Sequence, residues 1–436
     1  MSTDQGSRAD GRSGSARRVL GRIVIDTTPL RVPEFRRLWV TSAVTAVGSQ
    51  LTTVAVPKQV YDLTGSSGYV GLTGAVGFVS LIVFGLWGGA IADVVDRRKL
   101  LIGTNAGIAA MSALLWLQAF VGLRSVWLVL VLMGVQQAFV AVNMPTRSAV
   151  VPRLVPAELV APANALGFTV LTAGAVFGPL AAGALIPLFG LSTLYLIDTI
   201  GLVLALLLIL PLPAMVPGDG ASQSARLRDI VAGFRYVSTQ KVLLAACLLD
   251  LIAMIFGMPR ALFPEMAQHT FGDPPGGGPA LGWLYAAIPI GSAIFGLLSG
   301  WVSRMRRQGV VVTVAVLAWG VSITAFGLSS WLWLAVLFLA IGGGSDLISA
   351  IHRGAILQTA ATDEMRGRIQ GVFVVVVAGG PRIADMVHGW SATKVGTAVT
   401  SWAGGLLVIG CTLAAVIAMP AFWRYVAPST KTSPGD

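Results

Sequence analysis

The stretch Gly88-Gly-Ala-Ile-Ala-Asp93-Val-Val-Asp96-Arg97-Arg98-Lys99 ends in a cluster of charged residues. This cluster separates two long apolar segments, near residues 68–92 and 99–122. Each segment is longer than the roughly 20 residues that an α-helix needs to cross a bilayer. The whole chain has the same character, since 55% of its 436 residues are hydrophobic and 11% are charged. Soluble domains carry roughly 25% charged residues. The stretch therefore predicts two membrane-spanning helices joined by a turn, in an all-α membrane protein.

Apolar segments of spanning length recur along the chain, and one long hydrophilic break at 213–240 separates two sets of six. The predicted spans lie near 37–60, 68–92, 99–122, 125–149, 160–186, 190–212, 242–268, 280–302, 309–329, 331–357, 367–390 and 396–423. We expect a disordered cytoplasmic tail (1–28), an N-terminal six-helix half (29–212), a cytoplasmic linker (213–240), a C-terminal six-helix half (241–424) and a second tail (425–436). Pro29–Arg37 is interpreted as a short amphipathic lead-in, with Phe35 and Trp39 near the membrane interface.

Lysine and arginine are distributed unevenly among the connections. If both termini are cytoplasmic, all but five of the 30 Lys and Arg lie in the tails, the linker and the connections on the same side. The exceptions are Lys58, Arg124, Arg260, Arg382 and Lys394. Because cytoplasmic connections carry the excess of basic residues, this bias predicts a multi-pass protein of the cell (cytoplasmic) membrane with both termini inside. It also accounts for the net charge of +11 without nucleic acid as a partner.

The two sets of six spans contain an internal repeat. The segment from Arg147 to Glu158 follows span 4, and the segment from Arg353 to Glu364 follows span 10, at a constant offset of 206 residues. Gly-Pro pairs at 178–179 and 380–381 match at an offset of 202, in spans 5 and 11. Two six-span halves related in this way are the basis of alternating access about a site at the membrane midplane.

The loop from Gly88 to Lys99 resembles the signature loop of the major facilitator superfamily, in which a Gly precedes an Asp by four residues and a basic cluster follows. Gly89 and Asp93 fill those places, whereas Asp96 stands where the family has a Gly. The resemblance implies twelve helices in two pseudo-symmetric bundles, with Asp93 latching the cytoplasmic side against the other half. A plain positively charged turn is the alternative. The candidate gate residues are Gly89, Asp93, Arg97, Arg98, Arg147, Arg353, Glu364 and Arg366.

Span 5 carries Gly174, Gly178 and Pro179 in a segment similar to the antiporter motif of exporters in this superfamily. Two other glycines of that motif are replaced by alanine. Proline inside a helix removes a backbone hydrogen bond and bends the helix, so we expect bends here and at Gly380-Pro381. A bend that serves packing alone is an equally acceptable interpretation.

Four further stretches resemble the enterobactin-exporter branch of the superfamily: Phe256–Pro264, Ser345–Ala350, Met365–Arg368 and Gly371–Arg382. The resemblance implies export of a siderophore or another amphipathic metabolite, driven by the proton-motive force and without a cofactor. Multidrug efflux by antiport is the alternative within transport, and uptake by symport is a further rival. The expected partners are a small molecule, an anionic siderophore or lipophilic drug, and the lipid bilayer around a monomer.

Ionisable residues inside the spans are functional candidates, because each costs at least ~2.5 kcal/mol to insert. Arg382 and Asp385 are three residues apart, so a structural ion pair on one helical face is expected, with structure and function left open. Asp198 is interpreted as holding a neighbouring helix by a hydrogen bond. We predict that Asp250, Asp346 or Asp385 carries the transported proton. The candidates for the proton or substrate site are Asp250, Arg260, Asp346, Arg382 and Asp385.

Other classes of protein fit the chain poorly. No lysine follows a glycine, so the sequence lacks a phosphate-binding loop of a primary pump. The three histidines, His269, His352 and His388, have no paired metal-ligand spacing, and no nucleophile motif indicates an enzyme. We expect neither a metal site nor a catalytic residue. Cys247 and Cys411 are interpreted as small apolar filler. A receptor that retained the fold without transport remains the third class.

Overall fold

The computed structural model describes residues 26–213, 227–298, 300 and 305–427, and this part of the chain is helical and contains no strand. The predicted tails and most of the linker lie outside the described residues. The elements are η1 (Thr28–Arg31), α2 (Pro33–Thr64), α3 (Ser67–Val94), α4 (Arg97–Val121), α5 (Val126–Leu154), η2 (Ala157–Leu159), α6 (Val160–Ile209), α7 (Leu227–Thr239), α8 (Lys241–Gly257), η3 (Arg260–Leu262), α9 (Phe263–His269), α10 (Pro279–Leu298), α11 (Gln308–Leu328), α12 (Leu332–Thr359), α13 (Asp363–Val395), α14 (Thr397–Ala418) and α15 (Pro420–Trp423).

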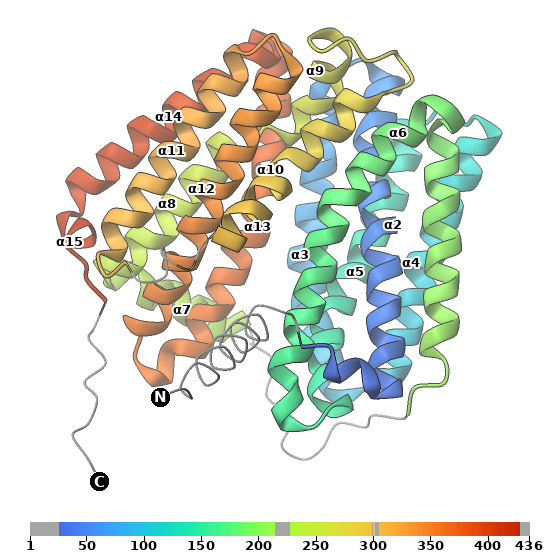
Figure 1. Cartoon of the computed structure of the whole chain (residues 1–436), viewed down its shortest axis with the longest axis horizontal. Helices are drawn as coiled ribbons and strands as arrows, with labels where there is room; N and C mark the ends of the chain where they lie inside the picture. Colours follow the sequence, from blue (N-terminus) through green and yellow to red (C-terminus); the bar gives the residue numbers. More distant parts are fainter. Residues whose placement is uncertain (1–25, 214–226, 299, 301–304, 428–436) are drawn as a thin grey trace, which may run out of the picture.

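The described helices are consistent with the twelve predicted crossings. Ten helical segments are long and apolar enough to span a membrane. The 32-residue α2 occupies the place of the first predicted span. Predicted spans 5 and 6 both lie within α6, which reverses direction at Gly190 (Figure 1). Gly190 has φ 76° and ψ 171°, a conformation that favours glycine because it has no Cβ.

The structure refines one detail of the predicted topology. The seventh span is not one continuous helix, because α8 ends at Gly257 and the chain continues through η3 into α9. Pro259, which lacks a backbone N–H, lies at this break. Phe35 is buried in a cluster with Val155 and Ala163, because α2 begins at Pro33 and packs this end on its neighbours. Its position near the membrane interface stays a prediction.

The helices form two bundles, α2–α6 and α8–α14, which meet along α3 with α13 and along α6 with α10 (Figure 1). Glycines allow the backbones to approach: a Cβ on Gly71 would lie 2.7 Å from the carbonyl oxygen of Asp385, and one on Gly183 would lie 2.8 Å from the Cα of Gly282. We call the end of the molecule that carries α9 the α9 end, and the opposite end, which carries α7, the α7 end.

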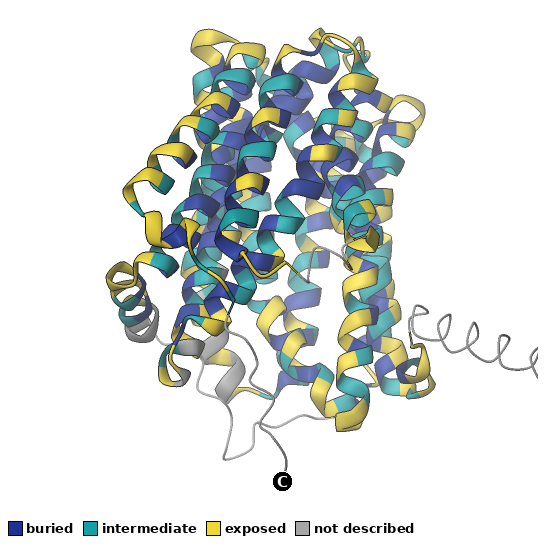
Figure 2. Cartoon of the chain, turned by 60° about the vertical axis from the view of Figure 1, so that its left-hand side comes forward, coloured by how far each residue is buried: buried dark blue, intermediate teal, exposed yellow. Residues whose placement is uncertain are grey.

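Buried residues line the faces along which the helices meet, while exposed residues follow the outer faces (Figure 2). Large apolar side chains such as Leu297, Leu188 and Ile417 are among those exposed. In a soluble protein this surface would be unfavourable, but in a bilayer the lipid tails cover it. The chain is therefore a multi-pass membrane protein of all-α architecture.

Candidate functional site

One buried cluster of charges lies inside the C-terminal bundle. The Nη2 atom of Arg353 on α12 is 2.7 Å from Oδ1 of Asp250 on α8 and 3.6 Å from Oδ1 of Asp346. Its Nη1 donates to Ser349 Oγ at 2.7 Å. Arg353 and Asp250 are 3% and 2% exposed, whereas Asp346 is 26% exposed. Arg353, which the repeat had suggested as a gate residue, therefore neutralises an intramembrane acid that has no partner on its own helix.

A second cluster lies where the two bundles touch. The carboxyl group of Asp385 on α13 interacts electrostatically with the guanidinium groups of Arg260 and Arg382. α3 packs closely on Asp385, since a Cβ on Gly74 would lie 2.6 Å from the Asp385 Cβ. Across the interface, Arg382 Nη2 donates to Oε1 of Gln137 on α5 at 3.3 Å. Two arginines and one acid leave this cluster with one net positive charge.

The expected ion pair between Arg382 and Asp385 is not formed among the described ion pairs. Arg382 Nη1 donates instead to the carbonyl oxygen of Ala378 at 2.8 Å, one turn towards the helix N-terminus. Long helical side chains lean in that direction, which carries the guanidinium towards Ala378 and Gln137 rather than towards Asp385.

The N-terminal bundle contains a buried acid with hydroxyl partners. Asp198 on α6 is 1% exposed, and its Oδ2 accepts from Thr52 of α2 at 2.7 Å and from Ser112 of α4 at 2.8 Å. The prediction that Asp198 holds neighbouring helices by hydrogen bonds is confirmed. A Cβ on Gly48 would lie 2.4 Å from its other carboxylate oxygen, so α2 passes closely over the acid.

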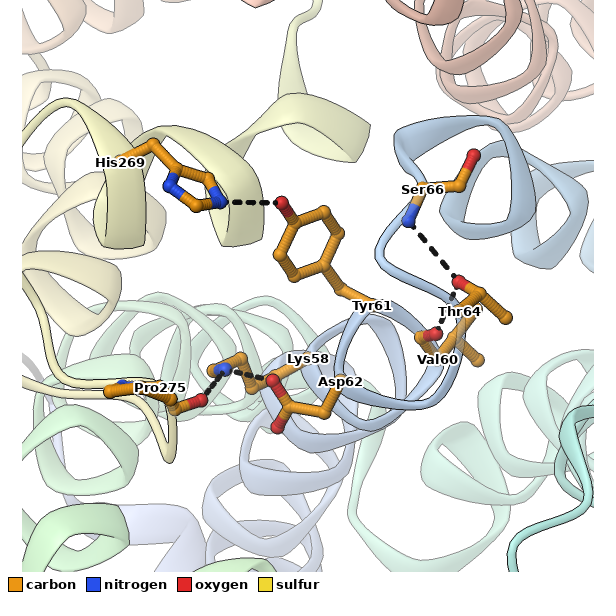
Figure 3. A network of polar contacts seen from close by, with 8 residues as sticks. All are labelled: Lys58, Val60, Tyr61, Asp62, Thr64, Ser66, His269 and Pro275. Carbon is orange, nitrogen blue, oxygen red and sulfur yellow. Dashed lines mark hydrogen bonds and ion pairs between the residues drawn. The ribbon is translucent and has the colours of Figure 1, made fainter.

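At the α9 end, a polar network joins α2 to the α9 region of the other bundle (Figure 3). Lys58 forms an ion pair with Asp62 and donates to the carbonyl oxygen of Pro275. Tyr61 Oη lies 3.1 Å from His269 Nε2. Lys58 is 1% exposed, so its charge is held by these oxygens rather than by water.

Two further contacts complete the α9 end. Ser67, at the start of α3, donates to the carboxylate of Glu265 on α9. Asp273 accepts from the backbone N–H groups of Ala280 and Leu281 at 3.0 and 2.8 Å, which caps the start of α10. Burial in this connection raises the pKa of the Asp273 carboxyl.

The predicted gate residues are spread over several environments. Arg97 and Arg98 bind the carbonyl oxygens of Ala149 (3.3 Å) and Leu210 (2.6 Å), inside the N-terminal bundle. Asp96 accepts from the backbone N–H of Arg98 and caps α4, which explains an acid where the family has a glycine. Arg147 of α5 is partly buried, and Glu364 is exposed near the start of α13. The surroundings of Gly89 and the side chains of Asp93 and Arg366 lie outside the described part of the structure.

The Gly-Pro motifs occupy equivalent places in the two bundles. A Cβ on Gly178 of α6 would meet Gln50 of α2 at 2.4 Å, and one on Gly380 of α13 would meet Met254 of α8 at 2.9 Å. Gly174 likewise faces Ala46 of α2. Pro179 and Pro381 lie inside α6 and α13, and the departure of α6 from helical angles is at Gly190 rather than at Pro179. The glycines therefore provide close packing against the first helix of each half.

The structure thus brings Asp250, Asp346 and Arg353 into one cluster and Arg260, Arg382 and Asp385 into another. Sequence reasoning missed the network at the α9 end. Lys58 and Asp62, four residues apart in a chain poor in charge, were the available signal. Among the described residues, no group of three His, Cys, Asp or Glu side chains could hold a metal ion.

Sequence comparisons with known proteins identify the family of this chain. A family model described as transmembrane secretion effector, within the major facilitator group, matches residues 25–434. The enterobactin exporter EntS of Escherichia coli O157:H7 is 31% identical over 412 residues, which cover 92% of this chain and 96% of that protein. The same exporter of Shigella boydii serotype 18 is 31% identical over 410 residues, with the same coverage.

Solved structures share the fold at low sequence identity. A peptide transporter POT superposes with a TM-score of 0.72 at 12% identity, over 90% of this chain and 95% of that one. The nucleoside transporter NupG gives 0.71 at 15% identity, over 90% and 99%. A bacterial homologue of the lysosomal transporter Spinster gives 0.68 at 15% identity, over 91% and 97%. The chain therefore belongs to the transmembrane secretion effector family of the major facilitator superfamily, a family of membrane transporters rather than enzymes.

Proposed function

We propose that this transporter exports an anionic, amphipathic small molecule of the siderophore class, driven by the proton-motive force and without a cofactor. The observation that carries the proposal is the net positive charge where the two bundles meet. Arg260 and Arg382 act there on a single acid, Asp385, and Arg382 also contacts Gln137 of the opposite bundle. All three charged residues are partly buried, and a net positive charge in such a site attracts an anion more strongly than it would in water. The relationship to an enterobactin exporter supports the same substrate class.

Both termini and the α7 end are assigned to the cytoplasm, because basic residues concentrate in those connections. The network of Lys58, Tyr61 and His269 then closes the outer side of the transporter. Residues 29–212 and 241–424 act as the two moving halves. Export requires them to separate at the α9 end and to close at the α7 end, where Asp93 and its basic neighbours form the latch.

The proposal is tested by proton-coupled efflux in inverted membrane vesicles. A catecholate siderophore and ethidium are offered separately, with and without an uncoupler, to vesicles that contain the transporter and to vesicles that lack it. We expect transporter-dependent accumulation of the catecholate that collapses with the uncoupler. Accumulation of ethidium alone would identify a multidrug antiporter. Catecholate accumulation only in right-side-out vesicles would identify an uptake symporter.

Arginine variants test the anion site itself. Arg382→Gln removes a charge-assisted contact of roughly 1.5–3 kcal/mol, so catecholate accumulation should fall about tenfold or more, while transport of a lipophilic cation should not fall. Arg424→Gln is the matched control, because Arg424 is exposed and lies beyond the last spanning helix. Equal losses for the catecholate and the cation would contradict an anion-specific role for Arg382.

A further inference from the structure

The cluster inside the C-terminal bundle contains two acids and one base. Arg353 is the basic partner of both Asp250 and Asp346 among the described ion pairs. With both acids ionised the cluster carries one net negative charge. An uncompensated charge in the membrane interior is costly, and one bound proton removes it. The cluster is therefore built to hold a single exchangeable proton.

The two acids are not equivalent. Asp250 is 2.7 Å from the guanidinium and 2% exposed, which describes a buried counter-ion. Asp346 is 3.6 Å away, outside hydrogen-bond distance, and 26% exposed. Its Oδ1 atom is buried and has no hydrogen-bond partner. Asp346 is therefore the acid that the arginine holds less tightly and that exterior water reaches more readily.

The exposed part of Asp346 does not face lipid. Leu337, Ile341 and Ile351 form the exposed apolar stripe of α12. At 3.6 residues per turn, Asp346 lies about half a turn around the helix from this stripe. It shares its face with Arg353, whose guanidinium is buried against α8. The accessible acid thus points towards the interior of the transporter.

The other elements packed against this part of α12 offer few competing groups. α10 and α11 meet Gly342–Gly344 with Ile288, Phe295 and Trp319, which do not titrate. On α8, the thiol of Cys247 interacts electrostatically with Asp250 and Arg353. On α12 itself, His352 binds the carbonyl oxygen of Ile348. On α13, Arg382 and Asp385 belong to the cluster between the bundles, and His388 lies 3.0 Å from the carbonyl oxygen of Phe256. The other charged residues of α13 lie near its two ends: Asp363, Glu364, Arg366, Arg368 and Lys394.

We propose that Asp346 is the proton-carrying residue of this transporter and that Arg353 is a positioning residue, kept in place by Asp250. The carboxylate of Asp346 takes a proton from water on one side, giving a neutral acid, and returns it to water on the other side. One O–H bond forms and later breaks, and the Asp250–Arg353 pair stays intact. This assignment rests on the proton coupling of the proposed function.

Infrared difference spectroscopy of the purified full-length transporter in liposomes tests the site without a substrate. Acidification should produce a protonated-carboxyl carbonyl band that is absent in Asp346→Asn. Asp346→Glu should retain the band but move its frequency, because the group that carries the proton has changed, and Asp250→Glu should leave it unmoved. A band that moves with Asp250→Glu, or one that persists unchanged in Asp346→Asn, would overturn the assignment.

Transport separates this inference from the proposed function. In vesicles, Asp346→Asn should lose at least tenfold in gradient-driven accumulation of the catecholate siderophore, yet still exchange labelled for unlabelled siderophore. Uncoupler-sensitive accumulation that persists in Asp346→Asn would overturn the role of Asp346 alone. Absence of accumulation by the unmodified transporter would overturn the proposed function, and the infrared band would still decide whether Asp346 binds the proton.

Discussion

The two bundles share one architecture but differ in how their polar interiors are satisfied. In the N-terminal bundle, Asp198 is held by the hydroxyls of Thr52 and Ser112. In the C-terminal bundle, Asp250 is held by the guanidinium of Arg353. Hydroxyl partners fix a neighbouring helix without adding charge. An ion pair with a second acid nearby, held more loosely, can change its net charge by one proton. If Asp346 carries the proton as we propose, the first half supplies a framework and the second half moves the charge.

The same contrast appears in a second polar contact of the N-terminal interior. The amides of Gln59 and Gln118 exchange hydrogen bonds of 3.1 and 3.0 Å, and Tyr195 donates to Gln59 at 2.8 Å. These groups join α2, α4 and α6 through neutral partners.

The largest effect on stability is expected from Arg353→Met. It leaves Asp250 buried without its counter-ion, which costs about 3–5 kcal/mol. Thermal unfolding of the purified transporter in detergent measures the loss. The double variant Arg353→Met with Asp250→Asn removes both charges and should recover much of it. If the double variant is as unstable as the single one, the ion pair is not the source of the loss.

An intermediate effect is expected from alanine at the equivalent glycines of the two halves. Gly178→Ala places a Cβ 2.4 Å from that of Gln50 and 3.3 Å from the carbonyl oxygen of Val47, which should cost about 1–3 kcal/mol by overpacking. Gly380→Ala places a Cβ 2.9 Å from that of Met254, a smaller overlap that should cost less. The same melting experiment should rank Gly178→Ala well below Gly380→Ala in stability.

The control for this pair is Gly103→Ala, since no atom lies within 4 Å of the Cβ position on Gly103. Alanine there should be neutral or slightly stabilising, because it favours the helix. Equal losses at positions 178 and 380 would show that the two halves tolerate the added methyl alike and would remove this distinction between them.

The smallest effect is expected from Asp198→Asn. The amide oxygen can still accept from Thr52 and Ser112, and interhelical hydrogen bonds in membranes average about 0.6 kcal/mol. Stability should therefore fall by about 1 kcal/mol or less, and proton-driven accumulation should persist. Loss of uncoupler-sensitive transport in Asp198→Asn would contradict the framework role and place proton exchange in both halves.

Much of the fold was predictable because each span is a local property of the chain. Apolar length located the spans, and the break between predicted spans 5 and 6 coincides with Gly190 inside α6. The repeat placed Gly178 and Gly380 at equivalent depth, and both meet the first helix of their own half. The interruption at Pro259 was not predicted, because the apolar run continues through it.

The candidate site was predictable only as a set of residue types. The cost of burying charge identified Asp250, Asp346 and Arg382, but pairing them depends on which helices touch. Asp250 and Arg353 are separated by α10 and α11 along the chain, so no spacing rule could join them. Spacing also suggested a pair of Arg382 with Asp385, which is not among the described ion pairs, because Arg382 reaches Ala378 and Gln137 instead. Asp346 was expected near Arg353 on the same helix, and the two lie 3.6 Å apart.

By itself, the sequence determined that this chain lies in a membrane as apolar helices in two repeated halves, since hydrophobic length and basic loops act locally along the chain. Only the tertiary structure decided that one arginine serves two acids, that Asp198 has hydroxyl partners, and that Lys58 and Tyr61 close the α9 end. These outcomes depend on distances of a few ångströms between helices, which close packing of glycines sets and which sequence separation does not encode.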